Sequence, residues 1–441
     1  MSDDRAFFAR HAWLPGELAT DVRMEVEAGR FSAVTPGVDA RPGDEQLPGV
    51  VVAGMANTHS HAFHRVLRGR GGPNGGSFWT WREQMYAVAA RLEPDNYYAL
   101  ARAVFAEMAL SGITCVGEFH YVHHRADGTP YDDPNAMGIA LLDAARAAGI
   151  RITLLDACYL AGGLGTSGPL PLEPAQRRFS DGTATRWAER VARLPDRPDG
   201  RIGAAIHSVR AVGAEDISTV SRRAGSRPLH VHLSEQGAEN EACERAYGLT
   251  PTALLARCGA LRRGTTAVHA THLTPADITG LGEAGVGISF CPTTERDLAD
   301  GIGAARALAD AGAVLSLGTD QNTVIDLLEE ARGLEMNERL TSQRRGRFEP
   351  AQLITMLTEH GHRALGWADA GRIAVGARAD LVAVDTDSVR TVGADPASVL
   401  LTASAADVAT VVVDGRTVVE GHRHRTMDVA GELARAITAV S

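Results

Sequence analysis

The stretch Leu47–Arg65, "LPGVVVAGMANTHSHAFHR", joins a short apolar run to three closely spaced histidines. Its β-branched residues, set between glycines, predict a buried strand. His59 and His61 end that run, and because alternate residues of a strand share a face, their imidazoles point the same way. Two nitrogen donors on one face indicate part of a zinc site, although two hydrogen-bonded core histidines would give the same pattern.

Similar apolar runs recur along the middle of the chain, each separated from the next by a helical stretch. The seven that follow are "TCVGEFH", "RITLLDACYL", "RIGAAIHS", "PLHVHLSE", "TTAVHATH", "VGISFCP" and "AVLSLGTD". Alternating strands and helices predict a parallel sheet, and eight such strands suit a closed (β/α)8 barrel. Most of the runs end on a polar, reactive side chain, as expected at the carboxyl face of such a barrel.

The two chain ends have a different sequence pattern, in which short strands of alternating polar and apolar residues are interrupted by glycine and proline. Near the C-terminus, Asp414-Gly415 lies between two β-branched runs and indicates a hairpin. We therefore predict an α/β protein with a TIM-like (β/α)8 barrel over residues 51–370. Residues 1–50 and 371–441 would together form a small β-sandwich domain. A glycine-rich loop at 69–77 is expected to cover the barrel mouth.

Composition excludes several classes of partner. The 441 residues carry a net charge of −10, and the arginine doublets are short and separated by acidic residues, which argues against nucleic-acid binding. The five cysteines include no C-x-x-C pair, so neither a disulfide framework nor a cysteine zinc site is indicated. No apolar run is long enough to span a bilayer and no signal peptide is visible, so we expect a cytoplasmic protein without a membrane partner. A homodimer is compatible with this composition.

The chain has no lysine, since all 44 strongly basic side chains are arginine. This excludes Schiff-base chemistry, a P-loop lysine and a carboxylated lysine bridging two metals. A second H-x-H pair, His230 and His232 in "HVHLSE", precedes Glu235, and Asp320 follows the last predicted barrel strand. With the first pair, these residues predict a catalytic metal site that has room for water.

Further motifs make the pattern more specific. The segments "SHAFHR", "SFWTWREQMY", "HSVRAV", "HLSEQ", "VHATHLT", "CPTTERDLADG" and "GTDQN" together resemble the amidohydrolase superfamily and, within its aminohydrolase branch, the formimidoylglutamate deiminases. The resemblance spans nearly the whole chain, and "FWTWREQMY" is its most discriminating part. It implies hydrolysis of N-formimino-L-glutamate to N-formyl-L-glutamate and ammonia in histidine degradation. The implied substrate is a small dicarboxylic amidine, and the implied cofactor is one divalent metal ion per chain, Zn²⁺.

The resemblance also assigns roles to individual residues. The implied metal ligands are His59, His61, His232 and Asp320. The implied catalytic residues are Glu235, His269 and Asp320. The implied substrate-binding residues are His64, Arg82, Tyr121, His207 and Arg210. At the position of His64 a glutamine that contacts the substrate can stand in the family pattern, and histidine, which also offers a donor and an acceptor, departs from that pattern.

Two other functions fit parts of the sequence. A mononuclear zinc aminohydrolase acting on a purine, pyrimidine or triazine ring shares the ligand pattern, but its pocket would not need two arginines. Without the resemblance, each arginine would be read as a surface ion pair. A catalytically inactive barrel that serves as a scaffold would be expected to lack ligands or Glu235, and here all of these residues are present.

Overall fold

The segment that opens the barrel is divided between two sheets. The computed structural model describes residues 5–70 and 78–441, so most of the predicted glycine-rich loop lies outside the described residues. In it, β4 (Glu45–Ala53) and β5 (Met55–Ser60) are separated by Gly54 alone. A Cβ atom at Gly54 would lie 2.3 Å from Thr114 Oγ1, so only glycine lets the chain pass here. Val50–Val52, predicted as part of the first barrel strand, therefore belong to the other sheet.

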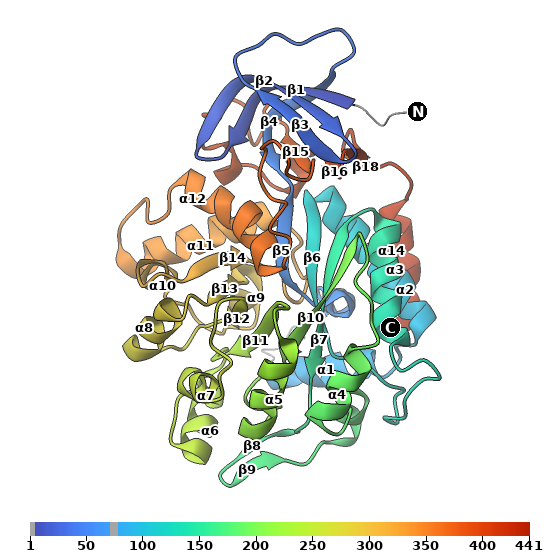
Figure 1. The fold of residues 1–441 in the computed structure, drawn as a ribbon, viewed down its shortest axis with the longest axis vertical. Coiled ribbons are helices and arrows are strands. Elements are labelled where there is room, and N and C mark those ends of the chain that lie inside the picture. The colour runs from blue at the N-terminus through green and yellow to red at the C-terminus, as the bar shows by residue number, and fades with distance from the viewer. Residues whose placement is uncertain (1–4, 71–77) are drawn as a thin grey trace.

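The predicted barrel is confirmed. Within the described residues, the parallel strands follow one another in chain order (Figure 1). They are β5, β6 (Ile113–His120), β7 (Arg151–Cys158), β10 (Gly200–Ile206), β11 (Leu229–Leu233), β12 (Thr265–His269), β13 (Gly287–Phe290) and β14 (Val314–Leu317). A parallel bridge between Ser60 and Asp320 nearly closes the ring. Ser60 is the last residue of β5, and Asp320 lies in the loop after β14. This closure brings the first and last strands together at their carboxyl ends.

Helices surround the barrel strands (Figure 1). They are α1 (Phe78–Ala89), α2 (Pro94–Leu110), α3 (Ala136–Ala148), α4 (Ala184–Val191), α5 (Ala214–Ala224), α6 (Gly237–Tyr247), α7 (Pro251–Arg257), α8 (Pro275–Glu283), α9 (Pro292–Asp297), α10 (Ala305–Asp310), α11 (Leu327–Ser342), α12 (Pro350–Thr355), α13 (Gly361–Ala364) and α14 (Val429–Val440). Several begin at side-chain caps, as where Thr274 accepts the Asp277 N–H at the start of α8. None of the helices in the described part of the chain has the length and apolar character of a membrane span.

The chain ends form a separate sheet, as predicted. Its strand order is β18 (Arg423–His424), β17 (Arg416–Glu420), β16 (Val408–Val413), β15 (Leu381–Val384), β4, β1 (Arg5–Leu14), β2 (Glu17–Glu27) and β3 (Arg30–Thr35). β4 pairs with β1 on one side and with β15 on the other, so it joins the N-terminal strands to the C-terminal ones. The predicted hairpin at Asp414-Gly415 connects β16 and β17, and both turn residues have positive φ.

A buried ion pair links the barrel to this sheet. Arg151 begins β7 and is 1% exposed, and its guanidinium contacts both carboxylate oxygens of the fully buried Asp380, which directly precedes β15. Arg151 Nη1 also donates to Asp414 Oδ1 at 3.1 Å.

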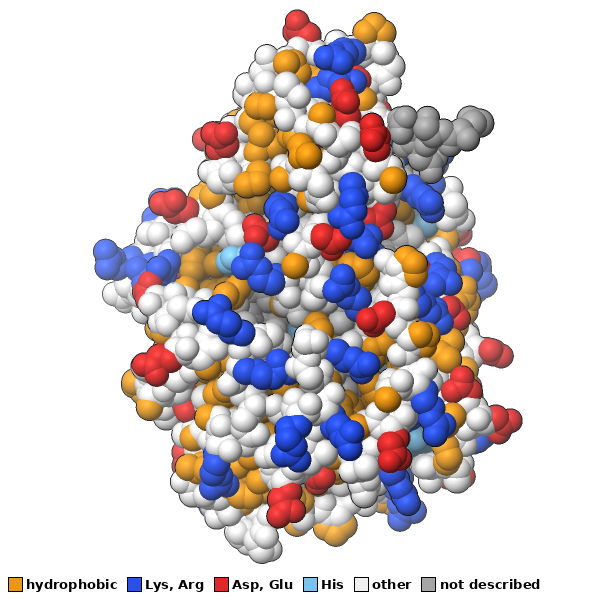
Figure 2. All heavy atoms as spheres, viewed as in Figure 1, with side chains coloured by type: hydrophobic (Ala, Val, Ile, Leu, Met, Phe, Trp, Pro, Cys, Tyr) orange, Lys and Arg blue, Asp and Glu red, His pale blue; other side chains and the backbone are white. Residues whose placement is uncertain are grey.

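On the face of the molecule shown in Figure 2, the arginine side chains lie dispersed among acidic and uncharged side chains, without a continuous basic stripe.

Candidate metal centre and active site

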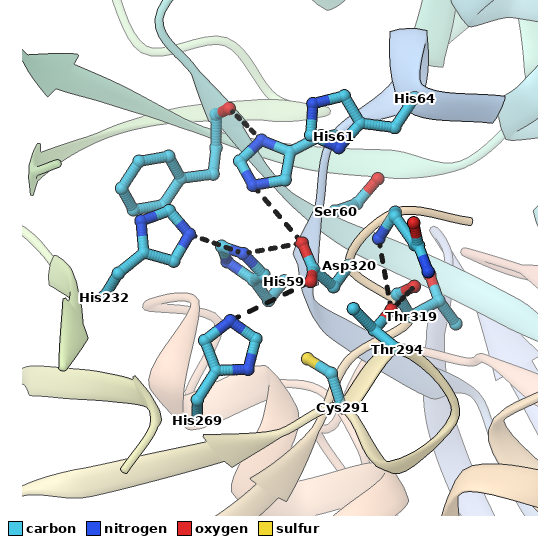
Figure 3. A network of polar contacts seen from close by, with 12 residues as sticks. His59, Ser60, His61, His64, His232, His269, Cys291, Thr294, Thr319 and Asp320 are labelled. Carbon is cyan, nitrogen blue, oxygen red and sulfur yellow. Dashed lines mark hydrogen bonds and ion pairs between the residues drawn. The ribbon is translucent and has the colours of Figure 1, made fainter. Parts of the chain in front are cut away.

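Four potential metal donors converge at the carboxyl ends of the barrel strands (Figure 3). His59 and His61 come from the end of β5, His232 from β11 and Asp320 from the loop after β14. Asp320 Oδ1 lies 3.3 Å from the Nε2 atoms of both His59 and His61. The Nε2 atoms of His59 and His232 are 3.1 Å apart. Three imidazoles and one carboxylate are a donor set that suits Zn²⁺ and other first-row divalent ions.

Backbone contacts fix the position of Asp320. A Cβ atom at Gly318 would lie 2.8 Å from the backbone nitrogen of His59, so this glycine allows the loop after β14 to run close against β5. The N–H groups of Thr319 and Asp320 both donate to the His59 carbonyl, and the His61 N–H donates to the Asp320 carbonyl at 2.9 Å. Asp320 has φ of +43°, which few non-glycine residues adopt. The strained backbone directs its carboxylate at the histidines.

The hydrogen bonds of two imidazoles favour metal binding. His61 Nδ1 donates to the Phe119 carbonyl at 2.9 Å, and His232 Nδ1 donates to the His207 carbonyl at 2.8 Å. Both rings therefore present an unprotonated Nε2 to the cluster. Burial lowers the pKa of both histidines well below the usual value, which keeps them neutral. A cation would relieve the repulsion between lone pairs at these short distances, so the residues present fit a divalent metal ion.

His269, at the end of β12, differs from the other histidines in its charge. Its Nδ1 lies 3.3 Å from Glu295 Oε1, and its Nε2 lies 3.8 Å from Asp320 Oδ2 and 3.9 Å from Glu235 Oε1. Burial alone would lower its pKa, but the hydrogen bond to Glu295 and the charges of Glu235 and Asp320 raise the pKa to about 10. A cationic imidazole donates hydrogen bonds, and His269 also forms a group of possible metal donors with His59 and Asp320.

Glu235 and Arg210 form an ion pair beside the cluster. Arg210 Nη2 lies 3.4 Å from Glu235 Oε2, and Arg210 Nε lies 2.9 Å from Oε2 of Glu239 on α6. Glu239 is 1% exposed and also accepts the Ser234 N–H through Oε1 at 2.9 Å. The guanidinium is thus held between two carboxylates, one of which faces the metal cluster.

These groups open into a cavity of about 620 Å³. Arg82 on α1 lines one wall, 3.7 Å from Glu173 and with its guanidinium 5.1 Å from the Tyr86 ring centre. The positive charges of Arg82 and Arg210 both contribute to lowering the pKa of His207, although burial is the largest cause. The positive charges of two guanidinium groups are therefore both felt at His207 in the cavity. The aromatic residues Trp81, Tyr86, Tyr121, Tyr159 and Phe179 also line the cavity.

Comparison with known proteins assigns this arrangement to a family. Residues 50–418 match the model described as the amidohydrolase family. The chain belongs to the amidohydrolase family. It is 36% identical over 438 residues to a formimidoylglutamate deiminase of Pseudomonas aeruginosa, covering 95% of each chain. It is 31% identical over 428 residues to a 5-methylthioadenosine/S-adenosylhomocysteine deaminase of Natronomonas pharaonis, covering 94% of this chain and 91% of the relative.

Solved amidohydrolase-fold structures agree with this assignment. An amidohydrolase from Brucella melitensis superposes with a TM-score of 0.92 at 33% identity, covering 99% of both chains. An adenosine deaminase from Xanthomonas campestris with bound zinc gives a TM-score of 0.83 at 25% identity, covering 99% of this chain and 97% of the other. The prediction that this protein is a hydrolase of the amidohydrolase family is therefore confirmed.

The structure brings together all the site residues predicted from the sequence of this amidohydrolase. Those that line the cavity are His61, His64, Arg82, Tyr121, His207, Arg210, His232, Glu235, His269 and Asp320. His59 is fully buried behind them, within the donor cluster. Two other histidines of these strand ends have different partners, since His230 donates to the Ala364 carbonyl and His272 to the Asp300 carbonyl.

Sequence reasoning missed two buried carboxylates of the amidohydrolase site. Glu239 follows Glu235 by four residues, a spacing that places both near the end of β11 once α6 begins. Glu295 lies in "CPTTERD", directly after β13, where a polar residue at a strand end could have marked it. Its Oε1 accepts the Cys291 N–H at 2.8 Å, which holds the carboxylate facing His269.

Proposed function

We propose that this protein hydrolyses N-formimino-L-glutamate to N-formyl-L-glutamate and ammonia, a reaction that belongs to histidine degradation. The observation that carries the proposal is the presence of two arginines, Arg82 and Arg210, in the same cavity as the donor cluster. The substrate has two carboxylates, and a planar guanidinium binds a carboxylate through paired hydrogen bonds. The identity to a formimidoylglutamate deiminase over nearly the whole chain supports this choice.

We assign the metal to His59, His61, His232 and Asp320, and take the ion to be Zn²⁺, as in the zinc-bound neighbour. Bound there, a divalent ion supplies Lewis-acid activation of water at neutral pH. Tyr121 and His207 also line the cavity, and we assign them hydrogen bonds to the substrate. His64 lines the cavity too, and we assign it a contact with the substrate.

The protein side chains move the protons of this reaction. Water adds its oxygen to the formimino carbon, and the terminal carbon–nitrogen bond then breaks. Glu235 accepts a proton from the attacking water and delivers it to the terminal nitrogen, and the proton of the new hydroxyl follows to the same nitrogen as the formyl carbonyl forms, so that the nitrogen leaves as ammonia. Asp320 assists the first transfer, since its second oxygen faces His269. Cationic His269 donates a hydrogen bond that stabilises the charge developing on the oxygen.

An ammonia-release assay on the zinc-loaded protein tests this function. We expect turnover with N-formimino-L-glutamate, and Arg210→Met and Arg82→Met should each raise KM more than they lower kcat. Arg263→Met, which changes an exposed arginine that does not line the cavity, is the control and should behave as wild type. Absence of ammonia release from this substrate with full metal occupancy would refute the proposal.

A second candidate function is deamination of a nucleoside or purine ring. The aromatic lining of the cavity and the identity to a 5-methylthioadenosine/S-adenosylhomocysteine deaminase favour it. Flat, uncharged rings stack on aromatic side chains but do not use the carboxylate-binding capacity of the two arginines. The same assay with 5′-methylthioadenosine and 8-oxoguanine distinguishes the two, because a preference for either ring would replace the leading proposal.

A further inference from the structure

Glu239 is a buried carboxylate that contacts two segments of the active site. It lies in the first turn of α6, where its N–H donates to the Gln236 carbonyl at 2.9 Å. Its Oε1 accepts the Ser234 N–H at 2.9 Å, and its Oε2 lies 2.9 Å from Arg210 Nε. A backbone N–H and a guanidinium can only donate, so the direction of both contacts is fixed. Glu239 therefore joins the turn after β11 to the loop after β10.

The turn after β11 has a strained backbone at the residue that Glu239 contacts. Ser234 has φ of +50°, which few non-glycine residues adopt, and it directly precedes Glu235. Such a conformation persists only where the surrounding contacts stabilise it. The Ser234 N–H bond to the Glu239 carboxylate is one of these contacts, so Glu239 helps to direct Glu235 at the cavity.

The guanidinium of Arg210 lies closer to Glu239 than to Glu235. Its Nε is 2.9 Å from Glu239, whereas its Nη2 is 3.4 Å from Glu235. Both carboxylates are buried, and a buried charge that loses one partner is costly unless another replaces it. Without the charge of Glu239, the guanidinium is therefore expected to move onto Glu235.

We infer that Glu239 is a positioning residue, which holds Arg210 in the cavity beside Glu235 but not fully paired with it. A guanidinium has several N–H donors, so contact of Nε with Glu239 is compatible with Nη donors binding a substrate carboxylate. Glu235 then stays available to accept the proton from water. This inference rests on the carboxylate binding proposed above for Arg210, and Glu239 acts through that arginine.

Steady-state kinetics of zinc-loaded Glu239→Gln, alone and combined with Arg210→Met, test this role. Glutamine keeps an oxygen for the Ser234 N–H but removes the charge that holds Arg210. We expect KM for N-formimino-L-glutamate to rise at least about tenfold, as for the loss of a hydrogen bond to a charged group, and kcat to fall. Added to Arg210→Met, the same change should alter neither constant, because the guanidinium is gone. Glu244→Gln, which changes an exposed residue of the same helix, is the control and should behave as wild type.

Equal effects of Glu239→Gln in the wild-type and Arg210→Met backgrounds would overturn the inference and make Glu239 a purely structural residue. If wild type does not turn over N-formimino-L-glutamate, the proposed function fails, and crystal structures of ligand-free wild type and Glu239→Gln decide the inference. The guanidinium should move toward Glu235 in the variant, and an unmoved guanidinium would refute the positioning role. If Glu239→Gln fails to fold, Glu239→Asp replaces it in both measurements, since it keeps the charge on a shorter side chain. It should raise KM, and a KM and an Arg210 position equal to those of wild type would then decide against the inference.

Discussion

At the scale of single residues, the site separates groups that hold a cation from groups that move protons. His61 and His232 are fixed as neutral donors by hydrogen bonds to backbone carbonyls. Glu235 instead contacts two cationic side chains, with Arg210 at 3.4 Å and His269 at 3.9 Å. Glu235 is thereby held between the cavity arginine and the catalytic histidine.

Replacing Glu235 by glutamine should separate catalysis from metal binding. Glutamine has the same shape but cannot accept and return a proton, so we expect kcat to fall by about 10²- to 10⁴-fold. Metal content, measured by atomic emission, should equal that of wild type because Glu235 is outside the proposed ligand set. Retention of wild-type turnover would show that another group transfers the proton.

Glu118 gives a pH-dependent contribution to stability. This β6 residue accepts the Ala62 N–H at 2.7 Å, and its burial raises its pKa to about 8 from an ordinary value of 4.5. Between pH 4.5 and 8 the folded protein therefore holds a proton that the unfolded chain has lost, so its contribution to stability decreases as pH rises.

Glu118→Gln should remove that dependence while keeping an oxygen for the Ala62 N–H. The free energy of unfolding of wild type relative to the variant should fall by about 1.4 kcal/mol per pH unit across this window. Urea denaturation of both metal-free proteins at pH 5, 6 and 7 measures the difference. A difference that stays constant with pH would contradict the assignment.

The sequence allowed prediction of the residues whose position follows from strand period. His59 and His61 share a face because they are two apart in β5, and Asp320 follows the last barrel strand. The hydrogen-bond partner of His64 could not be predicted, because Tyr121 is distant in the chain. Glu239 and Glu295 were missed for the same reason, since each acts through a partner on another element.

At the scale of elements, the ends of strands position the chemistry. β5, β11, β12 and the loop after β14 each deliver a side chain to one face of the barrel. The boundary between β4 and β5 was not predictable, because the apolar run Val50–Val52 fits either sheet equally well. The close approach of Thr114 and Asp380 to Gly54 decides it, and both are remote in the sequence.

The contact between β7 and the residues before β15 should be a main determinant of stability. Arg151→Met leaves the Asp380 carboxylate buried without its cation, which should cost about 3–5 kcal/mol. Arg146→Met, on the surface of α3 where the arginine pairs with Asp199, is the matched control and should cost less than about 1 kcal/mol. Chemical denaturation measures both, and equal effects would contradict the prediction.

At the scale of the whole molecule, part of the chain-end sheet shares the hydrophobic core of the barrel, while other residues of that sheet, among them Phe7 and Met24, form a second cluster. Val50 and Val52 of β4 and Val382 of β15 pack in the same cluster as barrel residues such as Leu154 and Val231. Together with the single-residue connection at Gly54, this packing makes independent unfolding of either part costly.

We therefore expect one cooperative unfolding transition for the metal-free protein. Differential scanning calorimetry should show a single peak whose calorimetric and van't Hoff enthalpies agree. Fluorescence from Trp13 in β1 and Trp187 in α4, each retained alone in a variant, should change at the same temperature. Two separate peaks would show that the sheet and the barrel are thermodynamically independent.

The pairing of β4 with β15 also has a consequence for synthesis on the ribosome. The proposed ligands and Glu235 all precede residue 321, but β4 ends at Ala53 and its partner begins only at Leu381. At ~5–20 residues per second, the 328 residues from Ala53 to Leu381 (381 − 53) take roughly 16–66 s to emerge. During that time one edge of β4 has no partner strand and is open to other chains. A translation product that stops after the barrel would therefore carry every proposed ligand together with an aggregation-prone edge.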